Sequence, residues 1–312
     1  MFLTGLIIVV FFTNVNLKNS IKKTKFAAYF FYKIRLTENM NFNFKLFCRL
    51  YAVLPIFFLS CKKNDTPNIQ NIKGDKQDFE IISIYAHDMN SFTEGFFFDN
   101  KTLFESTGSP NDLPDTKSVF GILDLKTGSI DVKAELDKNL FFGEGIAKSK
   151  DKIFQLTYKN KIGFIYNSKT FKQIGTFQFE NEEGWGLAST EDGTLIMSDG
   201  TNILTFVNPH GFKVISRIHV LDNEKPVYNL NELEYVDGYI YANVYTTSKI
   251  VKINPSNGKV IKTMNLDALS QEAKSRFTGA LEMNGIAYNK IKKTFLVTGK
   301  MWPCVFEIKF IE

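Results

Sequence analysis

The chain has 312 residues, 44% hydrophobic and 23% charged, which is the composition of a globular protein with one large domain or two small ones. Its 31 Phe and 12 Tyr, against only 8 Pro, favour β structure. The net charge of +5 comes from residues 1–61, which hold eight Lys or Arg and one Glu. Residues 62–312 therefore carry a net charge of −2, which gives no reason to expect a nucleic-acid partner.

We interpret the sequence before residue 78 as targeting sequence and tether. Residues 40–61, MNFNFKLFCRLYAVLPIFFLSC, place cations before an apolar run that ends at a cysteine. They resemble a bacterial lipoprotein signal peptide with Cys61 as the lipid-modified residue; an ordinary signal peptide or a membrane anchor is the alternative. We therefore expect residues 1–39 to lie upstream of the true start and residues 62–77 to form a flexible tether. The protein would be exported and lipid-anchored, in the bacterial periplasm or at the outer membrane.

Five repeats follow, at intervals of 41 to 52 residues. Each repeat has a second apolar run, such as KTLFESTG, and a third, such as SVFGILDL, and the first four add a fourth, such as GSIDVKAEL. Short strands with turn signals at this pitch are typical of a β-propeller with four antiparallel strands per blade. The residues that we take as equivalent, one from the start of each repeat, are Glu94, Glu144, Trp185, Glu232 and Asn284.

The two ends of the repeat region complete each other. The last repeat stops after its third strand, and a spare strand, DFEIISIYAHD at residues 78–88, precedes the first repeat. Pairing that strand with the last blade would close the ring and cover an open edge. We therefore predict an all-β, five-bladed propeller over residues 78–312, closed by an N-terminal strand. A β-sandwich with accidental periodicity is the alternative.

The stretch FFGEGIA, residues 141–147, places Glu144 between two glycines. Glycine weakens the interior of a strand, so a pair of them around one acid needs a reason. In a propeller the first strand of each blade lines the central channel, and glycines would let these strands approach the axis closely. We therefore expect Glu144 to face a cavity shared by the blades.

Several kinds of catalytic site lack support in the sequence. The three His show neither an HExxH pattern nor clustered spacing, and no G-x-S-x-G motif is present. Cys304 is the only cysteine after the predicted signal, so it forms no internal disulfide, and it has no evident His partner for nucleophilic catalysis. Carboxylates, amides, a lysine and aromatic rings remain, which favours a general acid–base site in an apolar pocket.

A series of ordered motifs then identifies a family. They are FTEG (92–95), LFESTG (103–108), FGEG (142–145), GFIY (163–166), GWGLA (184–188), SDG (198–200), LNELEY (230–235), ANVY (242–245), NGIAY (284–288) and VTGKMWP (297–303). Together they resemble the plant and bacterial glutaminyl cyclases (glutaminyl-peptide cyclotransferases), over residues 78–312. That family is a five-bladed propeller, in agreement with the repeats. The resemblance implies an acyltransferase, acting as a monomer, that converts the N-terminal Gln of peptides or proteins to pyroglutamate and releases ammonia.

The resemblance also assigns roles to three polar residues. Glu144 matches the family's carboxylate, which would carry a proton from the α-amine to the leaving nitrogen. Asn231 matches an amide that can donate to a carbonyl or oxyanion, and Lys300 a pocket lysine that can stabilise negative charge. The alternatives are a channel acid bonded to backbone, a turn-capping amide and a solvated surface lysine. Glu105 and Glu232 also lie on the channel side, and we interpret both as structural.

The remaining predicted pocket residues line the substrate site. Phe92 and Trp185 match walls of the family's pocket, although both could serve only in core packing. Glu94 stands where the family usually has Gln, and Tyr158 and Tyr245 stand where relatives often have Trp. Two carboxylates in one channel could repel each other and raise one pKa, or a protonated Glu94 could donate as the amide did. These departures bear on rate and substrate preference more than on the reaction itself.

Two other functions compete with the cyclase. One is a lipid-anchored propeller that binds peptides or proteins without chemistry, which has no need of Glu144, Asn231 and Lys300 together. The other is a calcium-dependent hydrolase of the lactonase type, which needs several metal-binding carboxylates in the channel. We expect no cofactor to be required for catalysis and no metal at the catalytic residues. Structural calcium in the channel is known in the family, but the sequence has no local calcium loop.

Overall fold

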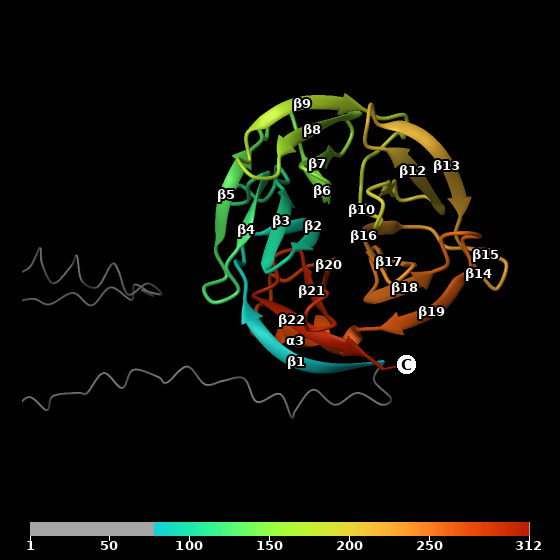
Figure 1. Ribbon diagram of the computed structural model, residues 1–312. Helices are drawn as coiled ribbons and strands as arrows, with labels where there is room; N and C mark the ends of the chain where they lie inside the picture. Colours follow the sequence, from blue (N-terminus) through green and yellow to red (C-terminus); the bar gives the residue numbers. More distant parts are fainter. Residues whose placement is uncertain (1–77, 312) are drawn as a thin grey trace, which may run out of the picture. The chain divides into compact units, whose positions relative to one another are not determined.

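The structure, a computed structural model, describes residues 78–311. Five four-stranded antiparallel sheets stand around a common axis as the blades of a propeller (Figure 1). The predictions for residues 1–39, 40–61 and 62–77, and for Cys61, lie outside the described residues. Within residues 78–311, no helix is long and apolar enough to cross a membrane.

Each blade runs from an inner strand at the axis to an outer strand at the rim. Blade 1 is formed by β2 (Phe92–Asp99), β3 (Thr102–Gly108), β4 (Val119–Leu123) and β5 (Ile130–Glu135). Blade 2 is formed by β6 (Gly143–Ser149), β7 (Lys152–Thr157), β8 (Ile162–Asn167) and β9 (Gln173–Gln178). Blade 3 is formed by β10 (Leu187–Ser189), β11 (Leu195–Met197), β12 (Ile203–Asn208) and β13 (Lys213–His219).

Two short additions accompany the last two blades. Blade 4 is formed by β16 (Leu230–Val236), β17 (Tyr239–Val244), β18 (Lys249–Ile253) and β19 (Val260–Asn265). Blade 5 is formed by β20 (Met283–Asn289), β21 (Thr294–Gly299), β22 (Cys304–Phe310) and β1 (Phe79–Ala86). The additions are the hairpin of β14 (Leu221–Asp222) and β15 (Lys225–Pro226), before blade 4, and the helix α3 (Asp267–Arg276), before blade 5.

The predicted closure by an N-terminal strand is confirmed. Strand β1 pairs antiparallel with β22 over its whole length, from Phe79 opposite Phe310 to Ala86 opposite Cys304. The first described strand of the chain thus forms the outer strand of the last blade, and it covers the edge that β22 would otherwise expose (Figure 1).

The hydrophobic core is divided into five clusters, one between each pair of neighbouring blades. Phe97 of blade 1 packs with Ile146 of blade 2, for example, and Phe96 of blade 1 packs with Leu296 of blade 5. The other three clusters join blades 2 and 3, blades 3 and 4, and blades 4 and 5. Because each blade is apolar on both faces, this arrangement excludes the β-sandwich alternative.

One repeat assignment was wrong by a residue. The inner strands of blades 2, 4 and 5 each shift register at a two-residue bulge near their start, and these bulges contain Glu144, Asn231 and Asn284 as their first residues. Asn231, and not Glu232, is therefore the blade 4 equivalent of Glu144. Glu232 takes the place that glycine has in the other repeats, and its carboxylate accepts the N–H groups of Phe96 (3.1 Å) and Ile286 (2.6 Å) across the axis.

We expect the closing strand to depend on Phe79, which is almost fully buried in the cluster between blades 4 and 5. Replacing Phe79 with Ala should lower the free energy of unfolding by about 3–5 kcal/mol, because it removes a buried ring and leaves a cavity. Urea unfolding measures this loss. Ile82→Ala is the matched control, because Ile82 lies on the same strand and is 40% exposed; its effect should stay within about 0.5 kcal/mol. Similar losses in the two variants would contradict this account of the closure.

Candidate active site

A pocket of about 470 Å³ opens where the inner strands begin and the second strands of the blades end. All eight residues predicted for the catalytic and substrate-binding site line it. They are Phe92, Glu94, Glu144, Tyr158, Trp185, Asn231, Tyr245 and Lys300. They come from all five blades, so only the closed ring brings them together.

The glycines around Glu144 allow the inner strands to approach each other closely. The N–H of Gly145 donates to the carbonyl of Trp185 at 2.8 Å, which ties blade 2 to blade 3 beside the pocket. A Cβ atom on Gly145 would lie 2.4 Å from that same carbonyl oxygen, and one on Gly143 would lie 2.6 Å from the carbonyl of Thr107. The glycine pair therefore serves inter-blade contact, and it leaves Glu144 as the side chain of this turn that faces the pocket.

Glu144 is 5% exposed and its carboxylate has no hydrogen-bond or ion-pair partner within residues 78–311. Only its backbone carbonyl is engaged, by the hydroxyl of Ser106 at 2.6 Å. Burial raises the pKa of Glu144 well above its ordinary value, and the negative charge of Glu94 raises it further, while Lys300 opposes both. A carboxyl group with a raised pKa and a free side facing a pocket can accept and return a proton near neutral pH.

Glu94 and Lys300 form a buried ion pair on the pocket wall. The Lys300 Nζ lies 2.5 Å from Glu94 Oε1, and Asn284 Nδ2 donates to Glu94 Oε2 at 3.0 Å. The ammonium also lies over the rings of Phe92, at 4.4 Å from the centroid, and Tyr245, at 5.1 Å. The ion pair and the aromatic rings together hold a desolvated cation at one defined place.

The two partners of this ion pair affect each other's ionisation. Burial raises the pKa of Glu94 to about 7, although the charge of Lys300 and its hydrogen bond act in the opposite direction. Burial alone would lower the pKa of Lys300, but the Glu94 and Glu144 carboxylates outweigh it, so the pKa is raised. Lys300 is therefore a cation at neutral pH, and Glu94 titrates in the range where the α-amine of a peptide also does.

Asn231 brings an amide to the pocket with its Oδ1 atom buried and unpaired. Its backbone carbonyl accepts the hydroxyl of Ser198 at 2.7 Å, which fixes the bulge of β16. Asn284, at the equivalent bulge of blade 5, lies behind Glu94 and also has an unpaired Oδ1 atom. Because an amide oxygen only accepts, a hydrogen bond donated by Asn231 to a bound group would have to come from its Nδ2 group.

Aromatic rings form the rest of the pocket wall. Trp185 lies just before β10, and its ring meets that of Tyr245 edge-on at 5.6 Å. Its indole N–H donates to Glu183 Oε2 at 2.9 Å. Tyr158, just after β7, has its ring 6.1 Å from that of Phe142. The predicted wall residues therefore do line one cavity.

Sequence reasoning missed the rim of this pocket. Residues 109–111, 138–141 and 159–160 line it as loops, together with the ring of Phe142. These loops follow the second strands or precede the inner strand of blade 2, so their position could have been inferred from the repeat order. Trp302 is fully buried outside the pocket, where its indole N–H donates to the carbonyl of Leu281.

Nothing in the structure tests the expectation of structural calcium. Over residues 78–311, no three His, Cys, Asp or Glu side chains gather as they would to hold a metal ion. Glu105 and Glu232 do not line the pocket, and both bond to protein groups instead.

Comparisons with known proteins agree on one family. The family model for glutamine cyclotransferase matches residues 52–310. A glutaminyl-peptide cyclotransferase of Arabidopsis thaliana is 35% identical over 234 residues, which cover 74% of this chain and 71% of that protein. The crystal structure of Myxococcus xanthus glutaminyl cyclase matches with a TM-score of 0.68 and 31% identity, over 75% of this chain and 97% of that one. These matches confirm the predicted family and fold, and they do not favour the binding module or the lactonase-type hydrolase.

We expect the glycine beside Glu144 to be needed for blade contact. Gly145→Ala should destabilise the protein, by about 1–3 kcal/mol, because the new methyl group would overlap the Trp185 carbonyl and the Leu187 amide of the next blade. Gly175→Ala is the matched control: it also lies in a strand, β9, and its added methyl group would meet its nearest atom at 3.9 Å. Thermal or urea unfolding measures both, and an equal effect of the two changes would contradict the close-approach argument.

Proposed function

The chain belongs to the glutamine cyclotransferase family and has glutaminyl-peptide cyclotransferase activity, and we propose that Glu144 carries the proton in this reaction. The observation that supports this role most directly is the free, buried carboxyl group of Glu144 in the pocket. Burying such a group without a partner is unfavourable, so its retention here favours a role toward a bound substrate.

The reaction closes a five-membered ring within one residue of the substrate. The α-nitrogen of an N-terminal Gln forms a bond with the side-chain amide carbon, and the bond from that carbon to the amide nitrogen breaks. The nitrogen leaves as ammonia and takes up one proton from the α-amine. Since attacking and departing groups belong to the same residue, the enzyme has to hold the folded-back conformer and move a proton over a short path.

Glu144 would make that transfer in two steps. In its ionised form it accepts the proton that the neutral α-amine loses as it attacks the amide carbon; the ordinary pKa of about 8 leaves part of the amine in this neutral form at neutral pH. The resulting neutral carboxyl group then donates to the departing nitrogen. Because burial and Glu94 raise the pKa of Glu144, its carboxyl group holds a proton more readily than an exposed glutamate does, as the donation step requires.

Lys300 and Asn231 would stabilise the oxyanion that forms on the amide carbon. Lys300 provides a positive charge that is held by Glu94 and by the rings of Phe92 and Tyr245. Asn231, at the bulge of the inner strand of blade 4, provides an amide whose Nδ2 group can donate in the same pocket. A fixed cation and a fixed donor in a largely desolvated site stabilise developing charge without having to reorganise.

The pocket supports peptides or proteins with N-terminal Gln as substrates. The rings of Trp185, Tyr158 and Phe92 line it beside the buried polar residues. Its rim is open to solvent at Leu140 and Lys159, so the chain that follows the first residue can leave the pocket. We further propose that the domain acts as a monomer and that Cys61 anchors it by lipid to a membrane after export. The export and the lipid anchor are supported by the sequence pattern of residues 40–61, and the monomer by the family resemblance.

Replacing Glu144 with Gln tests the proton-transfer role. We expect kcat for ammonia release from a Gln-initiated peptide to fall by about 10²–10⁴-fold, because an amide cannot accept and return a proton. Ammonia release and the matching mass loss of the peptide are measured together, with the uncatalysed rate subtracted. Glu80→Gln, an exposed glutamate on the outer strand β1, serves as the control and should keep the parent rate. Turnover by Glu144→Gln at the parent rate would exclude this role while leaving the reaction in place.

The charge on Glu94 should set the pH range of the reaction. Glu94→Gln removes a negative charge that raises the pKa of Glu144, so the acid limb of kcat/KM should move to lower pH by about one unit. Glu183→Gln removes a weaker contributor to the same pKa and should move the limb in the same direction by less. Rates of ammonia release across the pH range measure both. A limb that stays fixed or moves to higher pH in Glu94→Gln would contradict the coupling.

A further inference from the structure

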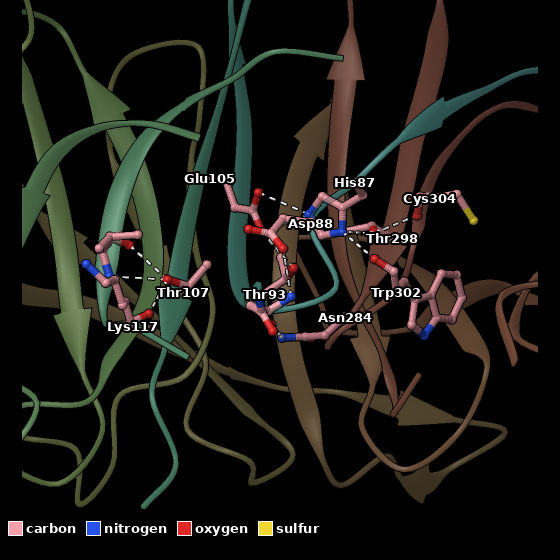
Figure 2. A network of polar contacts seen from close by, with 12 residues as sticks. His87, Asp88, Thr93, Glu105, Thr107, Lys117, Asn284, Thr298, Trp302 and Cys304 are labelled. Carbon is pink, nitrogen blue, oxygen red and sulfur yellow. Dashed lines mark hydrogen bonds and ion pairs between the residues drawn. The ribbon is translucent and has the colours of Figure 1, made fainter. Parts of the chain in front are cut away.

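A second buried ion pair lies directly behind the active site, between His87 and Glu105 (Figure 2). His87 follows β1 and precedes β2, and Glu105 lies in β3. Both side chains are fully buried, and neither lines the pocket. The proposed reaction mechanism uses neither residue, so the pair requires its own explanation.

The geometry around the imidazole ring indicates that His87 carries two protons. Its Nδ1 lies 2.8 Å from the carbonyl oxygen of Trp302, which can only accept. Its Nε2 lies 3.1 Å from both carboxylate oxygens of Glu105, one of which already accepts the hydroxyl of Thr93 at 2.8 Å. A neutral imidazole has one N–H donor and would leave one nitrogen lone pair against an acceptor. An imidazolium beside an ionised Glu105 satisfies both contacts.

The His87–Glu105 pair is linked to both partners of the Glu94–Lys300 ion pair. On one side, the Thr93 hydroxyl donates to Glu105, and Glu94 is the next residue of β2. On the other side, the His87 imidazole bonds to the carbonyl oxygen of Trp302, which lies two residues after Lys300 (Figure 2). Two backbone hydrogen bonds reinforce the link, since His87 N–H donates to the Pro303 carbonyl at 3.2 Å and Met301 N–H donates to the Ser91 carbonyl at 2.7 Å.

We propose that His87 and Glu105 are positioning residues that hold the segment 300–303 against blade 1 and thereby fix Lys300 at Glu94. Loss of the second proton from His87 would remove one of its two hydrogen bonds and loosen that segment. The consequence for catalysis rests on the role proposed above for Lys300, whereas the protonation of His87 and the order of the segment do not.

The groups around His87 define the direction of the pH effect. They are Asp88 on its own segment, Glu105 on β3, the Thr93 hydroxyl and the Phe96 ring on β2, and the Thr298 hydroxyl and Trp302 carbonyl from the end of blade 5. The Cys304 sulfur points away from the ring in Figure 2, and burial raises the pKa of this thiol to about 12. The charged groups in this list are both carboxylates.

These surroundings agree with the direction of the His87 pKa. Burial alone would lower it, but Glu105, the Trp302 carbonyl and Asp88 outweigh burial, so the pKa is raised above the ordinary value of 6.5. A group with a raised pKa in the folded state stabilises that state fully below the unfolded pKa, and this stabilisation is lost as pH rises through the folded pKa. The segment 300–303 should therefore loosen on the alkaline side.

Nitrogen NMR of the imidazole rings in the full-length chain tests the protonation directly. The sequence has three His, and His210 and His219 are exposed, so the signals of the buried His87 ring are assigned by their absence from His87→Leu. We expect both His87 nitrogens to show imidazolium shifts at pH 6.5, the ordinary value above which the surroundings of this ring raise its pKa. A neutral His87 ring at that pH in the folded protein would overturn the proposal.

Glu105→Gln separates the charge from the hydrogen bonds. The new amide can donate to Nε2 of a neutral imidazole, accept from Thr93, and leave Nδ1–H bonded to Trp302, so the segment 300–303 stays in place at high pH. In the parent we expect kcat to fall about tenfold above the His87 midpoint, with KM changed less than about twofold. In Glu105→Gln we expect no such fall in kcat at high pH. His87→Leu, which removes both bonds, should lose kcat at every pH. An unchanged alkaline limb in Glu105→Gln would overturn the proposal.

Amide hydrogen exchange makes the test independent of turnover. The N–H of Met301 bonds to Ser91 and that of Lys300 bonds to Glu282, so their exchange reports directly on the segment. Above the His87 midpoint we expect their exchange, corrected for the intrinsic pH dependence, to rise about tenfold in the parent but not in Glu105→Gln. Equal protection in both would refute the positioning role. If exchange behaves as expected and no variant cyclises a Gln-initiated peptide, the proposed reaction fails while the positioning of the segment stands.

Discussion

The close approach of five inner strands at one axis is the constraint on which the other features of this protein depend. At Gly145 the backbone of blade 2 lies so near blade 3 that a methyl group has no room. Such crowding excludes water from the polar groups on these strands, which raises the pKa values of Glu94, Glu144 and Glu232 through burial. The same packing that closes the ring therefore makes these carboxyl groups hold their protons more readily than exposed ones do.

Three of the charged groups at the axis form one system. Lys300 is the cation, Glu94 is its direct partner, and Glu144 is the second carboxylate that the same cation influences. One positive charge beside two carboxylates favours a state in which one of the two carboxyl groups keeps its proton. The α-amine of a bound substrate adds a further titrating group to this system. The His87–Glu105 pair lies behind the site and bonds to the chain on both sides of Glu94 and Lys300.

Much of the fold was predictable because each repeat carries its own strand and turn signals, and because the missing last strand had a visible replacement at residues 78–88. The eight pocket residues were located through ordered motifs. The register in blade 4 was misassigned because a bulge changes which residue faces the axis, and the pattern NELE places acids at both candidate positions. Glu105 was predicted to be structural, but its pairing with His87 was not predicted, because that pairing depends on ring closure, which brings blade 5 against the segment before β2.

The measurement that tests the central claim most directly is infrared spectroscopy of the carboxyl groups across the pH range, on the parent and on Glu144→Gln. The difference between the two spectra isolates Glu144 from the other buried acids. A protonated carboxyl band that is present near neutral pH in the parent and missing in the variant is the result that this account predicts. A Glu144 that is already fully ionised below pH 6 would contradict the claim that crowding at the axis prepares this residue to carry a proton.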